Sequence, residues 1–275
     1  MGSSAILGGV VGLILALTGA GGAILAVPLL LFVLHLGVAE AGPIALLAVG
    51  VSAAVGAAIG LRAGIVRYRA AALMAAAGVV FSPLGLWLAH KLPSGPLTLI
   101  FAAVLAYVSV RMYRQATAPA GQGAPQPAFS GPPQPCQLDT QSGRFVWTAA
   151  CTRALAASGV GAGFLSGLLG VGGGFVIVPA LRRATNAPMH AIVATSLAVI
   201  TLVSTSGVVS TAIAGRMNWP VAIPFAGGAI AGMLGGRLVS KRISGPRLQQ
   251  GFAVIAGLVA LGMVAKALLA GGWHG

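Results

Sequence analysis

The sequence predicts an all-α integral membrane protein made of two homologous helical repeats, inverted relative to each other. Hydrophobic residues make up 57% of the 275 residues and charged residues only 7%, whereas soluble domains carry about 25% charged residues. Several apolar runs reach the ~20 residues that a helix needs to cross a bilayer. In addition, the two halves of the chain align with each other without a gap.

Each half reads as four hydrophobic units. In the first half the units cover residues 5–34, 42–61, 70–89 and 95–113. In the second half they cover residues 154–181, 191–214, 219–239 and 247–269. The first unit of each half is broken by glycines, each of which costs a helix interior about 1 kcal/mol relative to alanine. We therefore expect a glycine-interrupted first membrane segment in each half.

A break in composition separates the halves. Residues 115–143 are rich in Pro, Gly, Gln and Ser, a composition typical of a flexible linker. The predicted domains are a first transmembrane repeat (1–114), the linker (115–143) and a second transmembrane repeat (144–275). The two cysteines, Cys136 and Cys151, give neither a disulfide framework nor a metal-ligand spacing, and we expect two unpaired thiols.

The internal repeat rests on one constant offset of 151 residues. At this offset "GAGGAILAVPLL" (19–30) aligns with "GVGGGFVIVPAL" (170–181), and six of the twelve positions are identical. The same register pairs further glycines and phenylalanines, including Gly12 with Gly163 and Phe101 with Phe252. Matches of this kind on one ungapped register indicate a duplication.

The basic residues predict that the repeats are inverted. If all eight units simply cross, the sixteen lysines and arginines divide almost evenly between the two sides. If the broken first unit of each half dips in and returns, only Lys91, Arg216 and Lys266 fall on one side and the other thirteen on the opposite side. The second arrangement satisfies the positive-inside rule. In it the charge bias of matched loops also reverses from one half to the other, as expected if the two halves are inverted in the membrane. It places the linker in the cytoplasm and both termini outside.

Several classes of protein are excluded. The basic residues lie at the ends of apolar runs and form no stripe with aromatic residues, which argues against nucleic-acid binding. Two acidic residues, four histidines and two cysteines do not provide a catalytic or metal-binding constellation, so neither an enzyme, a cofactor nor a metal is expected. "GVGGGF" lies between membrane segments and cannot be a dinucleotide-binding turn, which requires a preceding strand.

The repeat and its glycine-proline element resemble the TauE/SafE-type sulfite exporter family of membrane permeases. The resemblance rests on "GLLGVGGGFVIVPAL" (167–181), "HAIVATSLAVI" (190–200) and "AGRMNW" (214–219), and covers nearly all of the chain outside the linker. It implies transport of sulfite, organosulfonates or related anions. The chain departs from the family at Ala23, where the second half has Gly174, and at Asn218, where relatives often carry an acidic residue.

We expect an anion site at the two glycine breaks. A half-helix N-terminus offers free N–H groups and a partial positive charge to an anion, and glycine lets a ligand approach the backbone. The alternative is that the glycines only allow close helix packing. The predicted substrate-binding residues are Gly19, Gly21, Gly22, Pro28, Gly170, Gly172, Gly173, Gly174, Pro179, Thr195 and Ser196. For the two hydroxyl residues, the alternative is a hydrogen bond to their own helix.

The predicted function is export of small sulfur-containing anions by alternating access around the paired glycine breaks. An anion leaving a cell that is negative inside gains about 2.3 kcal/mol per 100 mV, so export needs no coupling ion. The only acidic residue outside the linker is Glu40, which we interpret as a solvated loop residue. The expected location is the cell (inner) membrane, with the lipid bilayer and a small anion as partners. A homo-oligomer is compatible with the sequence, and a non-transporting assembly or scaffold protein is the alternative function.

Overall fold

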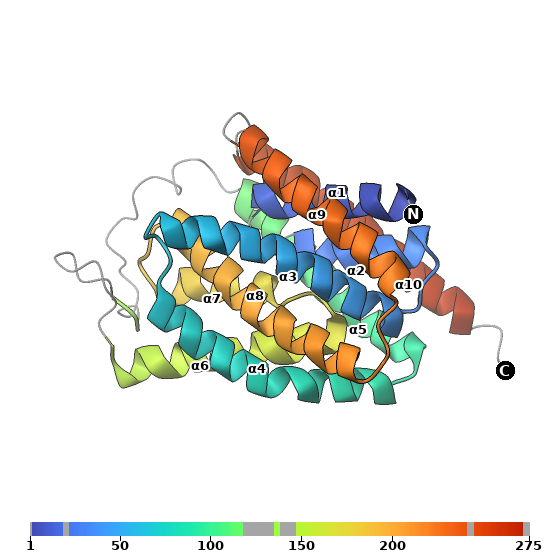
Figure 1. Ribbon diagram of the computed structural model, residues 1–275, viewed down its shortest axis with the longest axis horizontal. Helices are drawn as coiled ribbons and strands as arrows, with labels where there is room; N and C mark the ends of the chain where they lie inside the picture. Colours follow the sequence, from blue (N-terminus) through green and yellow to red (C-terminus); the bar gives the residue numbers. More distant parts are fainter. Residues whose placement is uncertain (1, 19–21, 118–134, 138–146, 241–244, 272–275) are drawn as a thin grey trace.

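The computed structural model describes residues 2–18, 22–117, 135–137, 147–240 and 245–271, and all of its regular elements are α-helices (Figure 1). In chain order these are α1 (Gly2–Thr18), α2 (Gly22–Val33), α3 (Val38–Arg62), α4 (Tyr68–Lys91), α5 (Ser94–Thr117), α6 (Ala149–Leu169), α7 (Gly174–Ala184), α8 (Met189–Ile213), α9 (Trp219–Ser240) and α10 (Gly245–Gly271). Five of them, α3, α4, α5, α8 and α9, contain stretches that are long and apolar enough to span a membrane. The predicted class of an all-α membrane protein is confirmed.

The predicted first unit of each half corresponds to two helices. Unit 5–34 contains α1 and α2, and unit 154–181 lies within α6 and α7. Each remaining unit corresponds to one helix. The helix α5 continues to Thr117, into the first residues of the predicted linker, and apart from 135–137 the rest of that linker lies outside the described residues.

The pair α6 and α7 forms a hairpin that enters the bundle and turns back. A Cβ atom placed on Gly173, next to the start of α7, would lie 2.6 Å from the carbonyl oxygen of Ala162 in the middle of α6. At the other end, Cys136 is joined to Cys151 near the start of α6, and its N–H donates to the carbonyl of Ala184 at the end of α7 (3.0 Å). The start of α6 and the end of α7 therefore lie at the same end of the bundle.

The pair α1 and α2 folds in the same way. A Cβ atom on Gly22, the first residue of α2, would lie 2.7 Å from the carbonyl oxygen of Val11 in the middle of α1. The helix α2 thus begins beside the body of α1 and runs back along it. Two hairpins, one in each half, therefore have similar geometry.

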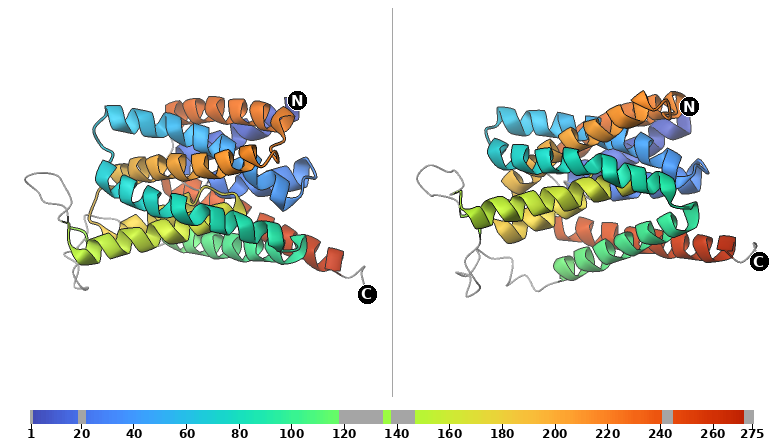
Figure 2. Two further views of the ribbon diagram at one scale, coloured as in Figure 1. Left: turned by 60° about the horizontal axis from the view of Figure 1, so that its bottom comes forward. Right: turned by 90° about the horizontal axis from the view of Figure 1, so that it is seen from below.

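At the centre of the bundle, α3 and α8 pack against each other in opposite directions. A Cβ atom on Gly60 near the end of α3 would contact Ala194 near the start of α8 (3.0 Å to Cβ). In the middle, a Cβ atom on Gly50 would lie 2.9 Å from Cβ of Ser204. The figures show the same antiparallel course (Figures 1 and 2).

Each hairpin packs in parallel on a helix of the other half through glycine contacts. Gly159 of α6 approaches Met74 of α4, and Gly167 further along α6 approaches Leu86 further along α4. In the same way α1 runs parallel to α9, with Gly12 against Ala229. Small residues let helix backbones approach closely inside a membrane, which explains the glycine-rich composition of these four helices.

These contacts define two ends of the bundle. We call one end the basic face: it contains the end of α3, the starts of α4, α6 and α8, and the end of α7. Arginines gather there, namely Arg62, Arg67, Arg69, Arg153, Arg182 and Arg183. The opposite face contains the starts of α1, α3 and α9 and the end of α4 (Figure 2).

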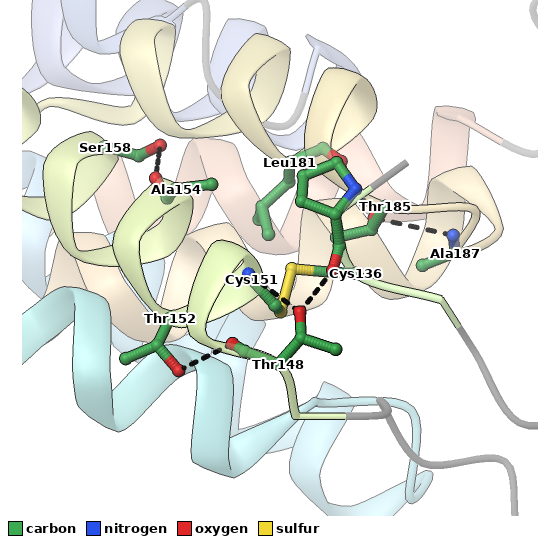
Figure 3. Close-up of a disulfide and its surroundings, with 10 residues drawn as sticks. Cys136, Thr148, Cys151, Thr152, Ala154, Ser158, Leu181, Thr185 and Ala187 are labelled. Carbon is green, nitrogen blue, oxygen red and sulfur yellow. Dashed lines mark hydrogen bonds between the residues drawn. A yellow bond between two sulfur atoms is a disulfide. The ribbon is translucent and has the colours of Figure 1, made fainter. Parts of the chain in front are cut away.

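The expectation of two unpaired thiols is wrong. Cys136 and Cys151 form a disulfide, and both side chains are buried (Figure 3). Thr148, which caps α6, also contributes: its hydroxyl donates to the carbonyl of Pro135 (3.0 Å) and accepts the N–H of Cys151 (3.1 Å). The sequence did not predict this pairing because the two cysteines lie 15 positions apart, with the end of the predicted linker between them, and its composition does not indicate that they approach each other.

Candidate functional site

The break between α6 and α7 is a turn made by Gly170, Val171, Gly172 and Gly173, which we call the glycine turn. Its three glycines have φ angles of 70°, 71° and 69°, in the left-handed region. This conformation costs other L-residues roughly 1–2 kcal/mol. The turn also touches α3, since a Cβ atom on Gly170 would overlap the backbone of Gly42. Glycine is therefore required here both by conformation and by space.

The glycine turn leaves backbone donors free. The N–H of Gly170 donates to the carbonyl of Ser166 (2.8 Å) and closes α6. The N–H groups of the next three residues find no acceptor among the described residues. All four residues of the turn are buried, and a buried N–H without a partner costs about 1–3 kcal/mol. A buried ligand with acceptor atoms would remove this cost.

Two serine hydroxyls next to the glycine turn are also without a partner. Ser204 of α8 and Ser166 of α6 are completely buried, and neither Oγ atom makes a hydrogen bond. The position that a Cβ atom on Gly172 would take lies 3.1 Å from Oγ of Ser204 and 3.2 Å from side-chain carbons of Val49 and Ile200. Gly172 therefore faces the point where α3 and α8 cross.

The chemistry of this cluster suits a small anion. It combines free backbone N–H groups, two uncommitted hydroxyls and the N-terminus of α7, which carries about half a positive charge. Successive N–H groups in left-handed turns form concavities that bind anions. Such irregular backbone is tolerated at membrane depth only where protein or a cavity covers it. The glycine turn meets this condition because its four residues are buried.

The other predicted residues of the second half lie at different distances from this cluster. Gly174 begins α7 directly after the turn, and Pro179 is in the middle of α7. Ser196 donates to the carbonyl of Val193 (2.8 Å), so its hydroxyl is bound to its own helix. Thr195 is buried near the basic face and accepts the backbone N–H of Arg67 (3.1 Å). It lies nine residues before Ser204 in α8, about 13 Å along a helix.

In the first half, Gly22 and Pro28 are buried in α2. Gly19 and Gly21 lie outside the described residues. The two halves differ in side chains at equivalent positions, because the 151-residue offset pairs Ser204 with Ala53 and Ser166 with Leu15. The hydroxyls of the cluster therefore come from the second half.

Two residues of interest did not stand out in the sequence. Ser204 was one hydroxyl among several in α8, and only the packing of Gly172 against it distinguishes it from Ser196. Glu40 lies exposed in the first turn of α3, where its Oε1 accepts a hydrogen bond from Nδ2 of Asn218 (2.9 Å). The signal that could have suggested this pair is the departure from the family pattern at Asn218.

Comparison with known proteins places the chain among membrane transporters. The model of the "Sulfite exporter TauE/SafE" family matches residues 4–263. A "Probable membrane transporter protein" of Xylella fastidiosa (strain 9a5c) is 33% identical over 267 residues, which is 92% of this chain and 91% of the relative. "Probable membrane transporter protein YunE" of Bacillus subtilis is 42% identical over 80 residues, or 29% of each chain. No solved structure matches the chain significantly.

Proposed function

The chain belongs to the sulfite exporter TauE/SafE family of membrane transporters, and on that premise we propose that it exports small sulfur-containing anions such as sulfite or organosulfonates. The observation that carries the proposal is the glycine turn: three of its N–H groups find no acceptor among the described residues, and Gly172 lies beside the unpartnered hydroxyl of Ser204. Sulfite and sulfonate groups present several acceptor oxygens and a negative charge, which match this set of donors.

The arrangement of helices supports inverted repeats. Moving from the first half to the second by 151 residues takes both ends of α3 (38 and 62) onto both ends of α8 (189 and 213). The same shift exchanges the parallel pair α1 and α9 with the parallel pair α6 and α4. Because α3 and α8 occupy equivalent places yet run in opposite directions, a two-fold axis perpendicular to them relates the halves. Inverted repeats of this kind typically hold the substrate between them.

We propose alternating access as the mechanism. The glycine turn of the second half lies against α3 of the first half, through Gly42 and Val49. A rocking movement of one half against the other would therefore open the buried turn toward one face and then toward the other. The membrane potential supplies a driving force for export of about 2.3 kcal/mol per 100 mV and per charge.

Flux of ³⁵S-sulfite and a panel of sulfonates in proteoliposomes tests this proposal. The key variant is Gly172→Ala, which places a methyl group 3.1 Å from Oγ of Ser204. Its matched control is Gly215→Ala, which has a similar φ of 65° but nothing within 4 Å of the new Cβ atom. The two variants carry similar backbone strain, but only Gly172→Ala also crowds Ser204, Ile200 and Val49. Flux is therefore compared only between variants whose thermal unfolding in detergent matches that of the wild type.

We expect Gly172→Ala to lower the flux about tenfold or more, because the new methyl group fills the space beside Ser204 that the anion would occupy. Gly215→Ala should keep most of the flux. Equal flux in both folded variants would contradict an anion site at the turn. Wild-type flux no higher than in protein-free liposomes, for every anion of the panel, would contradict transport of this class and favour the alternative of an assembly protein.

A further inference from the structure

The side chain of Arg67 lies at the basic face in a small recess. Arg67 directly precedes α4 and is half-buried, and its Nε atom is fully buried with no hydrogen-bond partner. The recess is lined by Arg67, Leu181, Thr185, Ala187, Ala191, Ile192 and Thr195, and it is packed too tightly to hold a water molecule. A ligand therefore enters it only when the partly exposed side chain of Arg67 moves outward. Its lining contains no carboxylate. A buried guanidinium nitrogen without a partner carries a desolvation cost that an anion would remove.

The equivalent position at the opposite face contains a carboxylate that the recess of Arg67 lacks. There Asn218, which directly precedes α9, donates to the carboxylate of Glu40 in α3. The 151-residue offset pairs Asn218 with Arg67 and Glu40 with Ala191. Ala191 is 1% exposed and lines the recess of Arg67. At the opposite face the protein supplies its own anion, whereas at the basic face it has a cation and a methyl group in the corresponding places.

Thr195 provides a second donor in the same recess. Its Oγ1 accepts the backbone N–H of Arg67, and its own proton has no acceptor among the described residues. The nearby hydroxyl of Thr185 is already used, because it donates to the carbonyl of Leu181 (2.8 Å). Arg67, just before α4, and Thr195, in α8, thus offer a guanidinium and a hydroxyl proton from different halves of the chain.

We propose that Arg67 and Thr195 form a second anion site at the basic face, which binds a small oxyanion of the sulfite or sulfonate class before it reaches the glycine turn. The identity of the anion rests on the proposed function. The site is distinct from the turn, since Thr195 is nine residues from Ser204 along α8. The surrounding arginines raise the local concentration of anions at this end of the bundle. Among the arginines that the structure describes, Arg67 has a buried Nε without a partner.

Two variants test the site from opposite directions. Arg67→Gln removes the cation but keeps a polar side chain of moderate length. Ala191→Glu places a carboxylate where the repeat has Glu40, so it should occupy the guanidinium from within the protein. Arg69→Gln is the matched control, because Arg69 is exposed and lies over the ring of Tyr68 (6.0 Å to its centroid).

The first measurement is equilibrium dialysis of ³⁵S-sulfite and of radiolabelled methanesulfonate against the purified full-length protein in detergent. We expect the wild type and Arg69→Gln to bind two anions per protein, and Arg67→Gln and Ala191→Glu to bind at one of the two sites at least about tenfold more weakly. If Ala191→Glu does not fold, the comparison of Arg67→Gln with Arg69→Gln still tests the site. Equal binding by Arg67→Gln and Arg69→Gln, or no binding of either probe to the wild type, would overturn the site.

The second measurement separates this site from the proposed function. In vesicles of known orientation, Arg67→Gln should raise the half-saturating sulfite concentration about tenfold when sulfite is added at the basic face. The maximal rate should change much less. Normal flux and affinity in Arg67→Gln, together with loss of flux in Gly172→Ala, would reject the second site alone. Binding that depends on Arg67 without any wild-type flux would reject transport alone.

Discussion

Gly172 faces Ser204: a Cβ atom on the glycine would lie 3.1 Å from the serine Oγ, although Gly172 lies in the turn between α6 and α7 and Ser204 lies in α8. The contact joins the glycine turn to the antiparallel crossing of α3 and α8. It brings a backbone in the left-handed conformation next to a buried hydroxyl that has no partner. This contact ties the predicted glycine element to one specific side chain.

The first prediction concerns that hydroxyl. Ser204→Ala should reduce the affinity for the transported anion by about tenfold or more, since a hydrogen bond to a charged group contributes roughly 1.5–3 kcal/mol. The fold should not suffer, because the hydroxyl makes no hydrogen bond within the protein. Flux measured against anion concentration in proteoliposomes gives the result.

Ser196→Ala is the control for this measurement. The hydroxyl of Ser196 is also buried in α8, but it donates to the carbonyl of Val193 on its own helix. We expect the affinity of Ser196→Ala for the anion to stay within about twofold of that of the wild type. If Ser196→Ala were impaired and Ser204→Ala were not, the anion path would run along the other side of α8.

The second prediction concerns the packing of α6 on α4. A Cβ atom on Gly163 would overlap the backbone of Gly78, whereas one on Gly161 has nothing within 4 Å. Gly163→Ala should therefore lower the free energy of unfolding by about 1–3 kcal/mol through overpacking. Gly161→Ala should instead be neutral or stabilising by up to ~1 kcal/mol, because alanine favours helix over glycine.

Thermal unfolding of the two variants in the same detergent is the appropriate measurement. The prediction requires midpoints that shift in opposite directions, or a fall for Gly163→Ala alone. A Gly163→Ala midpoint equal to that of Gly161→Ala would mean that α6 and α4 are further apart than the structure places them.

Much of the fold could be predicted from the sequence because membrane spans leave a strong signal. The units around 42–61 and 191–214 correspond to α3 and α8 within a few residues at each end. The glycine pattern also marked the break at 170–173 correctly, since a turn with three left-handed residues requires glycine. Helix number was less clear, because a hydropathy pattern does not separate one broken span from a hairpin of two helices.

The site could be predicted only in part, for a physical reason. Glycine turns are local and appear as local composition, whereas Ser204 and Arg67 matter through partners that are far away in the sequence. Thr195 and Ser196 are neighbours with similar side chains, yet one accepts the N–H of Arg67 and the other bonds to its own helix. The disulfide between Cys136 and Cys151 likewise depends on how the chain returns to α6.

The third prediction concerns the orientation in the membrane. Most of the lysines and arginines that the structure describes fall on the side of the basic face, which by the positive-inside rule should be cytoplasmic. The disulfide at that face favours an oxidising compartment instead, since disulfides are rare in the cytosol. The positive-inside rule, which rests on many charges, therefore predicts a cytoplasmic basic face and a cysteine pair that is reduced in growing cells.

Two exposed arginines on opposite faces make a matched test of orientation. Arg69→Cys reports on the basic face and Arg216→Cys on the opposite face, each in a background with Cys136→Ser and Cys151→Ser. In intact cells a membrane-impermeant maleimide should label the cysteine at 216 and leave the cysteine at 69 unlabelled until the cells are permeabilised. The reverse pattern would place the basic face and the disulfide outside.

The last prediction concerns the pair of Glu40 and Asn218, which links α3 to the start of α9 across 178 residues of sequence. Because the pair is exposed, its loss should cost less than about 1 kcal/mol of stability. Asn218→Asp places a second carboxylate within hydrogen-bond distance of the first, and should destabilise the protein more than Asn218→Ala. The double variant Glu40→Gln with Asn218→Asp should recover that difference, because a hydrogen bond between an amide and a carboxylate forms again with donor and acceptor exchanged. Thermal unfolding of the three variants in one detergent at neutral pH measures this, and equal midpoints for Asn218→Asp and Asn218→Ala would show that the two side chains are apart in solution.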